Sequence, residues 1–575
     1  MFQVLRSFGV AALAISLAGG LTPTPASAQS IPGAYLAGRQ ALHDSDFAAA
    51  AAYYSRALAM DPGNPGLMEN LILSQLALGQ IDRALPVAQI MQERGLNSQI
   101  AQMVVIANQI VAEDYDAILA RDPQRQAIGP LVDGLVEAWA LMGAGSVARA
   151  LEAFDTVAAT NGLRSFALYH KAMALAMVGD FEGAEAIFQQ EEGGLLGMPR
   201  RAAVARVEIL SQLERNPDAL ALLTENFGSH LDPGLLALAQ RLETGERLPF
   251  SHVRDVRDGM AEVFFTIGAA LNGEASDDYA LIYARMAVFL RPDHVDALLL
   301  SASLLDRLGQ YDLSIEAYKR IPETSPDHHA AELGRAEALR RSARPDAAIE
   351  VLEQLARKYP EQAQIHTALG DLFRQQEDYA AAVAAYDRAL EHSETGAPGE
   401  WFLLYARGIC HERLKNWDAA EADFRRALEL NPDQPQVLNY LGYSLVERQE
   451  KLTEALEMIE RAVARRPDSG YIVDSLGWAL FRLGRYEEAV QHMEKAVELM
   501  PVDPVVNDHL GDVYWAVGRA REAEFQWKRA LSFIDPTDTD SEADPERIRR
   551  KLEIGLDAVL KEEGAKPLKL ANGSH

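Results

Sequence analysis

The residue types that do chemistry in enzymes occur in this sequence without the spacing that enzymes require. The serine of LGYSL lacks the second glycine of a nucleophile elbow, the sharp turn that exposes a catalytic serine. His411 and Glu412 begin like a zinc-binding helix, but Lys415 stands where the second histidine should be. His328 and His329 are adjacent, so on a helix they point in different directions and cannot share a metal ion. With no glycine-rich phosphate loop either, we predict no catalytic site, no metal site and no cofactor.

Aromatic and acidic side chains towards the C-terminus offer a different chemistry, the binding of a peptide. The stretch YIVDSLGWALFRLGRYEEAVQHMEKAVELMP, residues 471–501, carries Trp478 and Phe481 beyond the apolar residues that its own core needs. Rings beside carboxylates suit an extended or helical peptide with apolar anchors and basic neighbours. Whether these rings face a ligand depends on the elements that carry them.

Those elements repeat along the chain. Small residues recur every 34 or 35 residues, apart from four extra residues in the loop HSETGAPGE, at Gly268, Ala302, Ala336, Gly370, Gly408, Gly442, Gly477 and Gly511. Pairs of alanines seven residues apart follow in most units, as at Ala420 and Ala427, and seven residues are two helical turns. Helix-stopping prolines close nearly every unit, at Pro292, Pro326, Pro360, Pro432, Pro467, Pro501 and Pro536. The pattern predicts a unit of helix, turn, helix and stop.

At these positions the chain resembles the tetratricopeptide repeat family, with eight consecutive units in residues 261–536. The stretch AYLAGRQALHDSDFAAAAAYYSRALAMDPGNP near the N-terminus carries the same pattern, and weaker copies follow at Gly79, Gly145 and Gly179. Residues 95–128 and 190–250 keep helical periodicity without the markers. The resemblance implies an all-α fold, a right-handed α-solenoid of helix-turn-helix repeats. Two arrays meet near 247–259, where the interrupted periodicity suggests a hinge or a kink in the solenoid.

The same patterns predict five segments of the chain. We expect a signal peptide at 1–28, a degenerate helical array at 29–246, a linker at 247–260, the eight-repeat array at 261–536, and a capping helix with a polar tail at 537–575. The linker prediction rests on RLPFSHVRDVRDG, where proline and charges interrupt the apolar periodicity. The cap is expected to be one amphipathic helix that covers the last repeat with Ile548, Leu552, Leu556 and Val559.

In such a solenoid the first helix of each unit lines the concave side. This assigns eleven residues of the last four repeats to a peptide-binding groove: Phe402, Tyr405, Asn439, Tyr443, Tyr471, Asp474, Trp478, Phe481, Asp508, Asp512 and Trp515. We expect Trp478, Tyr443 and Tyr471 to face a ligand, whereas Phe481 and Trp515 equally suit packing between successive first helices. The basic and asparagine pairs with which some family members hold a terminal carboxylate are replaced by Asp474, Tyr443 and Asp512, so an acidic C-terminal tail is not the expected ligand.

The net charge of the chain indicates which kinds of partner it can bind. The chain has 84 acidic and 55 basic residues, which gives a net charge of −29. A phosphate backbone has to be met by a basic surface, so nucleic acid is excluded as a partner. An acidic surface suits basic partners.

The N-terminal sequence indicates export. An apolar run from Phe8 to Leu21 is too short for a stable membrane span, and Ala26-Ser27-Ala28 is typical of a signal-peptidase site. We predict cleavage after Ala28 and a periplasmic or secreted protein with no membrane span after cleavage; an uncleaved anchor is the less favoured alternative. The sole cysteine, Cys410, lies among apolar neighbours, so we expect a packed thiol, no intramolecular disulfide and no lipid-bearing cysteine at the cleavage site.

The phrase DSLGW, Asp474 to Trp478, and its flanking repeats resemble the exported tetratricopeptide proteins of the bacterial cell envelope, although the chain lacks the cysteine that many of them carry for a lipid. This resemblance implies a non-enzymatic scaffold for proteins or peptides, such as an adaptor for an envelope protease and its substrates, or for cell-wall or outer-membrane machinery. Two alternatives stay open: a periplasmic chaperone for unfolded envelope clients, and an enzyme with an unrecognised site in 190–260.

Overall fold

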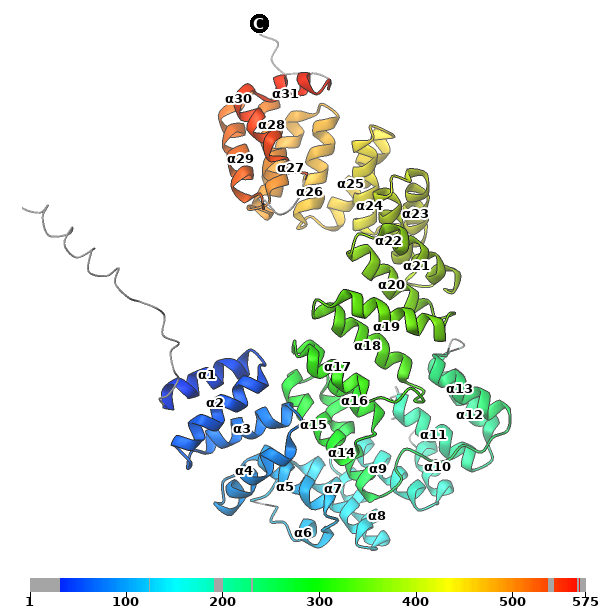
Figure 1. The fold of residues 1–575 in the computed structure, drawn as a ribbon. Coiled ribbons are helices and arrows are strands. Elements are labelled where there is room, and N and C mark those ends of the chain that lie inside the picture. The colour runs from blue at the N-terminus through cyan, green and yellow to red at the C-terminus, as the bar shows by residue number, and fades with distance from the viewer. Residues whose placement is uncertain are drawn as a thin grey trace, which may run out of the picture. The chain divides into compact units, whose positions relative to one another are not determined.

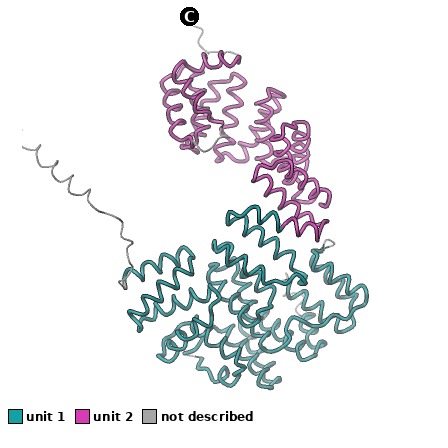
Figure 2. Tube along the Cα trace, in the orientation of Figure 1, with its two compact units in different colours: residues 1–351 teal, residues 352–575 magenta. Residues whose placement is uncertain are grey.

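The computed structural model describes residues 31–123, 125–190, 200–228, 231–535, 542–565 and residue 568. The predicted signal peptide, 1–28, and Pro536 lie outside these residues. The described residues form 31 α-helices and no β-strand. The chain divides into two compact units, residues 1–351 (unit 1) and 352–575 (unit 2), coloured separately in Figure 2.

Unit 1 holds the first eighteen helices and the start of the nineteenth. They are α1 (Ile31–His43), α2 (Phe47–Met60), α3 (Pro65–Ala77), α4 (Ile81–Glu93), α5 (Gln99–Val111), α6 (Tyr115–Leu119), α7 (Pro130–Gly143), α8 (Val147–Ala158), α9 (Arg164–Met177), α10 (Phe181–Gln190), α11 (Arg200–Gln212), α12 (Asn216–Phe227), α13 (Pro233–Glu243), α14 (Val256–Leu271), α15 (Asp277–Leu290), α16 (Val295–Arg307), α17 (Tyr311–Lys319), α18 (His328–Arg341) and α19 (Pro345–Lys358). The division between the units falls inside α19.

Unit 2 holds the rest of α19 and twelve further helices. They are α20 (Ala363–Gln375), α21 (Tyr379–Glu391), α22 (Glu400–Arg413), α23 (Trp417–Leu430), α24 (Pro435–Glu447), α25 (Leu452–Arg465), α26 (Gly470–Arg482), α27 (Tyr486–Leu499), α28 (Pro504–Ala516), α29 (Ala520–Phe533), α30 (Pro545–Ile554) and α31 (Leu556–Glu562). Figure 1 shows α20 to α29 as successive helical hairpins.

The predicted repeat is confirmed: α14 to α29 supply two helices for each of the eight expected units. The recurring small residue lets the two helices of a hairpin approach closely. A Cβ added at Gly370 would lie 2.6 Å from the ring of Tyr386, and one added at Gly408 would lie 2.7 Å from the ring of Phe424. The large residue between each alanine pair therefore fills the space that the glycine leaves.

In unit 1, helices far apart in the sequence pack together. The first helices α3, α5, α7 and α9 contact α14 or α15. Trp139 of α7 donates from Nε1 to Nδ1 of His170 on α9 at 3.3 Å, and Nε2 of His170 lies 3.1 Å from the hydroxyl of Thr266 on α14. Burial lowers the pKa of His170 to about 4, so this ring is neutral at pH 7 and can accept one hydrogen bond while donating the other.

The segment 247–260, where we expected a linker, lies within unit 1, and the unit boundary falls about a hundred residues later. Leu248 is buried among apolar residues of α11 to α13, and Val253 is buried in the cluster that includes Phe264. From Val256 onward the segment already belongs to α14. Its proline and charges thus interrupt the helical periodicity while its apolar residues hold it against neighbouring helices.

We expected one capping helix, but the structure has two, because α30 ends at Ile554 and α31 begins at Leu556. Gly555 between them has a φ of 81°, a conformation that interrupts a right-handed helix and that glycine adopts readily. Ile548, Leu556 and Val559 are buried as the amphipathic pattern predicts. The two short helices pack at the end of unit 2, beside α28 and α29 (Figure 1).

Candidate functional site

The eleven residues predicted to line a groove all lie on α22, α24, α26 and α28, the first helices of the last four hairpins. Four of them, Asn439, Tyr443, Tyr471 and Asp474, line one open cavity of about 550 Å³ in unit 2. The other seven lie outside its lining.

Trp478 is buried, so the expectation that it faces a ligand is wrong. Its side chain stacks on the ring of His509 from α28, with 3.9 Å between ring centres, and on Phe481, with 4.9 Å. Its Nε1 donates to Glu447 of α24 at 2.8 Å. One indole thus connects three successive first helices, which is the packing role that we had also considered for Phe481.

The charged neighbour of this stack is Asp474. Its carboxylate lies 3.1 Å from Nδ1 of His509, and both side chains are mostly buried. Burial alone would lower the pKa of His509, but the charge and hydrogen bond of Asp474, together with the charges of Asp508 and Asp512, outweigh burial and the pKa is raised. Asp474 therefore anchors the next repeat as well as bordering the cavity.

Asp508, Asp512 and Trp515 bind the C-terminal helices. The ammonium of Lys551 on α30 lies 2.8 Å from Asp508 and 2.7 Å from Asp512, with its side chain fully buried. Trp515 donates from Nε1 to Asp557 of α31 at 2.9 Å. In this structure the far end of the predicted groove is occupied by the chain itself.

The two residues nearest the start of the predicted groove take different positions. Tyr405 is half-buried and packs its ring against Phe424 and Tyr440, with ring centres 6.1 and 6.0 Å away. Phe402 is exposed but does not line the cavity.

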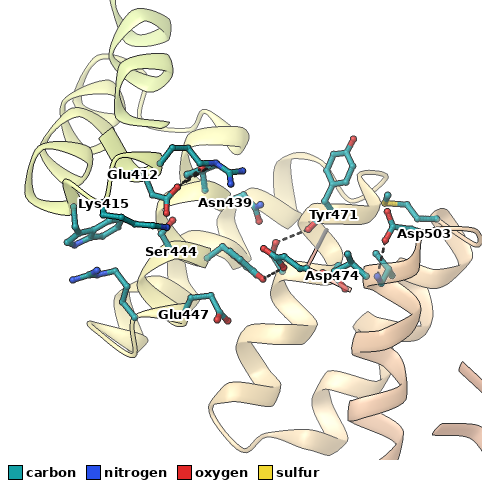
Figure 3. Close-up of a pocket in the computed structure, with 18 residues that line it drawn as sticks. Glu412, Lys415, Asn439, Ser444, Glu447, Tyr471, Asp474 and Asp503 are labelled. Atoms are coloured by element: carbon teal, nitrogen blue, oxygen red, sulfur yellow. Dashed lines mark hydrogen bonds and ion pairs between the residues drawn. The ribbon is translucent and has the colours of Figure 1, made fainter. Parts of the chain in front are cut away.

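The residues that line the cavity come from four consecutive hairpins. Figure 3 shows their side chains. Its walls come from α22 and the turn after it, the start of α23, α24, α26, the C-terminal cap of α27 and the start of α28, together with Glu542 from the segment before α30. The ring of Tyr471 stands clear of α26, and its residue is 64% exposed. Tyr443 donates to Glu542 at 2.9 Å, and burial together with that carboxylate raises the pKa of the phenol.

Two polar atoms in the cavity wall are buried without a hydrogen-bond partner among the described residues. They are the carbonyl oxygen Oδ1 of Asn439, an acceptor, and Nε1 of Trp417, a donor. Buried polar groups are nearly always hydrogen-bonded in native proteins. An acceptor and a donor in one wall match the two groups of a peptide unit.

The cavity carries more acidic than basic side chains. Glu412, Glu447, Asp474, Asp503 and Glu542 contribute carboxylates, and Arg413, Lys415 and Arg448 contribute cations. Arg448 is positioned over the ring of Trp417, 4.7 Å from its centre. The surface therefore offers aromatic rings beside net negative charge.

Sequence reasoning missed Trp417, Asp503 and Glu542. Trp417 opens a second helix and Asp503 precedes a first helix, so neither falls on the inner stripe that we read from the sequence. Glu542 reaches Tyr443 across 99 residues of sequence, and no local pattern could have indicated that contact.

Unit 1 holds a second cavity, of about 470 Å³, where α9, α11, α14 and α16 meet. Its wall is mainly apolar, with Phe166 and Phe265 among its residues, and its charged side chains are paired: Arg201 with two acidic residues of the wall, and Arg200 with Asp232 and Asp327 outside it. Arg201 contacts Glu262 at 2.8 Å and also pairs with Asp296. Burial alone would raise the pKa of Glu262, but Arg201 and His294 together hold it well below its usual range, so the carboxylate stays charged and paired.

A compact non-helical domain in 190–260 would support the enzyme alternative. The described part of that segment forms α11, α12, α13 and the start of α14, so no such domain occurs there among the described residues. Within the described ranges, no cluster of three histidine, cysteine or acidic side chains is arranged to hold a metal ion. In the part of the chain that the structure describes, no helix has the length and apolarity needed to cross a membrane.

Comparison with known protein families agrees with the helical hairpins of the structure. Models of the tetratricopeptide repeat match residues 41–104, 135–194, 278–329, 333–400, 401–434 and 441–504, which together cover more than half of the chain. A TPR repeat-containing protein from Pseudomonas aeruginosa is 34% identical over 98 residues. That match covers 17% of this chain and 17% of the relative, so the chain spans far less than two thirds of that protein's length.

Solved structures give more distant likenesses. A tetratricopeptide repeat protein from Parabacteroides merdae is 18% identical, with 44% of this chain and 96% of that chain covered and a TM-score of 0.36. The Cut9–Hcn1 hetero-tetramer of the APC/C is 14% identical, with 90% of this chain and 96% of that chain covered and a TM-score of 0.36.

Proposed function

Because this chain belongs to the tetratricopeptide repeat family, we propose that it is a non-enzymatic scaffold that binds a protein or peptide partner at the inner surface of unit 2. Membership of the family supports the general role of a protein-interaction scaffold. The observation that carries the choice of site is the open cavity of about 550 Å³ lined by consecutive first helices. Its volume lies in the range of about 300–1,000 Å³ that is typical of ligand sites.

The chemistry of the cavity favours a peptide with a basic side chain. The ring of Tyr471 is exposed in the free protein, so it can make apolar contacts with a ligand without first breaking contacts inside the chain. Oδ1 of Asn439 and Nε1 of Trp417 have no hydrogen-bond partner among the described residues, but both atoms are buried, so main-chain groups of a ligand reach them only if neighbouring side chains move. The carboxylates of Asp503 and Glu412 add attraction for a lysine or arginine.

A pair of matched substitutions tests this site. Tyr471→Ala removes an exposed ring from the cavity, and Phe525→Ala removes a ring of similar exposure, 59%, from α29 outside it. Both variants should melt like the wild type, because neither ring is buried. If Tyr471 anchors the partner, its variant should lose about 2 kcal/mol or more of binding free energy, the range of an interface hot spot. If both variants bind the partner with the same affinity, this cavity is not the binding site.

We further propose that the scaffold acts in the bacterial periplasm as an adaptor for an envelope protease or for cell-wall or outer-membrane machinery. Two features of the sequence support this proposal. One is the signal-peptide pattern before Gln29, and the other is the motif DSLGW, which resembles the exported tetratricopeptide proteins of the cell envelope. Cell fractionation with N-terminal sequencing should find a periplasmic chain that starts at Gln29. An intact chain in the cytoplasm would refute the location.

A pull-down from an envelope extract separates the adaptor from the chaperone alternative. Recovery of one stoichiometric enzyme or cell-wall protein favours the adaptor. Recovery of many unfolded outer-membrane clients favours the chaperone.

A further inference from the structure

The C-terminal helices occupy part of the inner surface of unit 2 through charge. The ammonium of Lys551 pairs with both Asp508 and Asp512 of α28, and its side chain is fully buried. It also lies 5.8 Å from the ring centre of Trp527. The surface thus holds a lysine between two carboxylates and an aromatic ring, a set of groups that is selective for a cation.

Further polar contacts fix the segment at other points. Arg547 lies 3.7 Å from Asp512, and Asp557 accepts a hydrogen bond from Trp515 at 2.9 Å. Glu542 accepts one from Tyr443 at 2.9 Å. Because Glu542 also lines the open cavity, the C-terminal segment borders the site that we propose for a peptide.

The polar character of this contact is more than a cap requires. A helix that only shields the last repeat from water could do so with apolar side chains. A buried ion pair contributes little net stability, because the loss of hydration offsets most of the attraction, and in some proteins such a pair selects the partner that fits. The contact of α30 therefore resembles recognition of one particular helix.

We propose that the surface formed by Asp508, Asp512 and Trp515 is a second binding surface, which takes a lysine-bearing amphipathic helix of a partner protein in place of α30. This inference rests on the scaffold function proposed above and extends the partner site to α28. In the free chain α30 is the resident ligand, and the partner helix competes with it.

Charge complementarity supports this kind of occupant. The sequence of α30, PERIRRKLEI, carries four basic residues, and it sits on an acidic surface of a chain with a net charge of −29. Its buried contact uses one lysine together with Ile548 on the same helix. A partner helix needs the same two features, a lysine and an apolar stripe.

A fluorescent peptide of residues 542–563 serves as the probe, and the full chain is the receptor. In the wild type the resident helix competes with the peptide, so binding should be weak. Lys551→Gln in the full chain should release α30 and strengthen peptide binding at least tenfold. A peptide that carries the same K551Q change should lose its binding. Arg549→Gln is the matched control, because Arg549 pairs with Glu546 of its own helix and is exposed.

The stability of each variant decides between exchange and a fixed cap. Cooperative unfolding of the K551Q chain together with the tenfold gain supports the proposal. Loss of cooperative unfolding without a gain in peptide binding would overturn it, since α30 would then be an integral part of the fold. Dimers that form by exchange of α30 between two copies would overturn the assignment to a partner protein. Each of these outcomes is independent of the Tyr471 variant, which tests the cavity alone.

Discussion

At the scale of single residues, the aromatic side chains of the inner surface divide into rings that hold the repeats together and rings that stay open. Trp478 belongs to the first group because it contacts His509 and Phe481 and is hydrogen-bonded to Glu447. Tyr471, seven residues earlier on the same helix, belongs to the second. Both residues fall on the inner stripe, and the partners on neighbouring helices decide between the two roles.

Trp478→Ala should therefore destabilise unit 2. Removal of a buried tryptophan costs about 3–5 kcal/mol, and the change also leaves the carboxylate of Glu447 without its indole donor. Urea unfolding followed by circular dichroism measures the loss. Unchanged stability together with weaker partner binding would instead place Trp478 in the ligand site.

His509 should make the stability of unit 2 depend on pH. The pKa of His509 in the folded chain is raised above its usual 6.5, since the attraction of Asp474, with smaller contributions from Asp508 and Asp512, exceeds the effect of burial. The protonated ring binds its proton more tightly in the folded state, so its contribution is complete below about pH 6.5 and is lost as the pH rises through the raised pKa. The free energy of unfolding, measured in urea at pH 6 and at pH 9, should differ less between the two pH values in His509→Gln than in the wild type. The same difference in both proteins would contradict this assignment.

At the scale of helices, the sequence predicts the hairpins well because their signals are local. The small residue, the alanine pair and the proline recur within one repeat, and each acts on its own hairpin, as Gly408 does on Phe424. The buried contacts of the site were not predictable in this way. Lys551 meets Asp508 across 43 residues, and the break at Gly555 depends on a single glycine within an otherwise continuous amphipathic pattern.

The addition of one methyl group tests how closely the two helices of a hairpin must pack. Gly408→Ala places a Cβ 2.7 Å from the ring of Phe424, so we expect a loss of about 1–3 kcal/mol, typical of overpacking. Gly399→Ala is the control, because a Cβ there has no neighbour within 4 Å and its φ is −97°. The control should change stability by about 0.5 kcal/mol or less. If the two variants unfold alike in a denaturant titration, the close approach at Gly408 is not required.

At the scale of the whole molecule, the family and the repeat number could be predicted, but the grouping of the repeats could not. The sequence suggests two arrays that meet near 247–260, whereas α14 and α15 pack against α3, α5, α7 and α9 within unit 1. Gly259 illustrates this packing, since a Cβ there would lie 2.6 Å from the ring of Trp139. Such contacts join residues that are far apart in the sequence, 93 positions for Tyr169 and Glu262 and 208 for Ala77 and Arg285, and leave no periodic signal.

Fragments of the chain test this grouping. A fragment of residues 261–575 lacks the helices that cover α14 and α15, so buried side chains such as Phe264 and Tyr283 should become exposed. We expect it to bind a hydrophobic dye and to unfold with low cooperativity. A fragment of residues 345–575, which keeps α19 whole together with the rest of unit 2, should bind less dye. If residues 261–575 unfold as sharply as the full chain and bind no dye, the array starting at 261 is an independent domain.

The central claim is that a protein partner binds in the cavity beside Tyr471, and site-specific photocrosslinking tests it most directly. A photoreactive phenylalanine analogue replaces Tyr471 in one protein and Phe525 in another, two exposed positions of which only the first borders the cavity. Irradiation of the intact complex, followed by mass spectrometry, identifies which position is joined to the partner. We predict a covalent adduct at position 471 and none at position 525. An adduct at 525 alone, or equal yields at both positions, would contradict the claim.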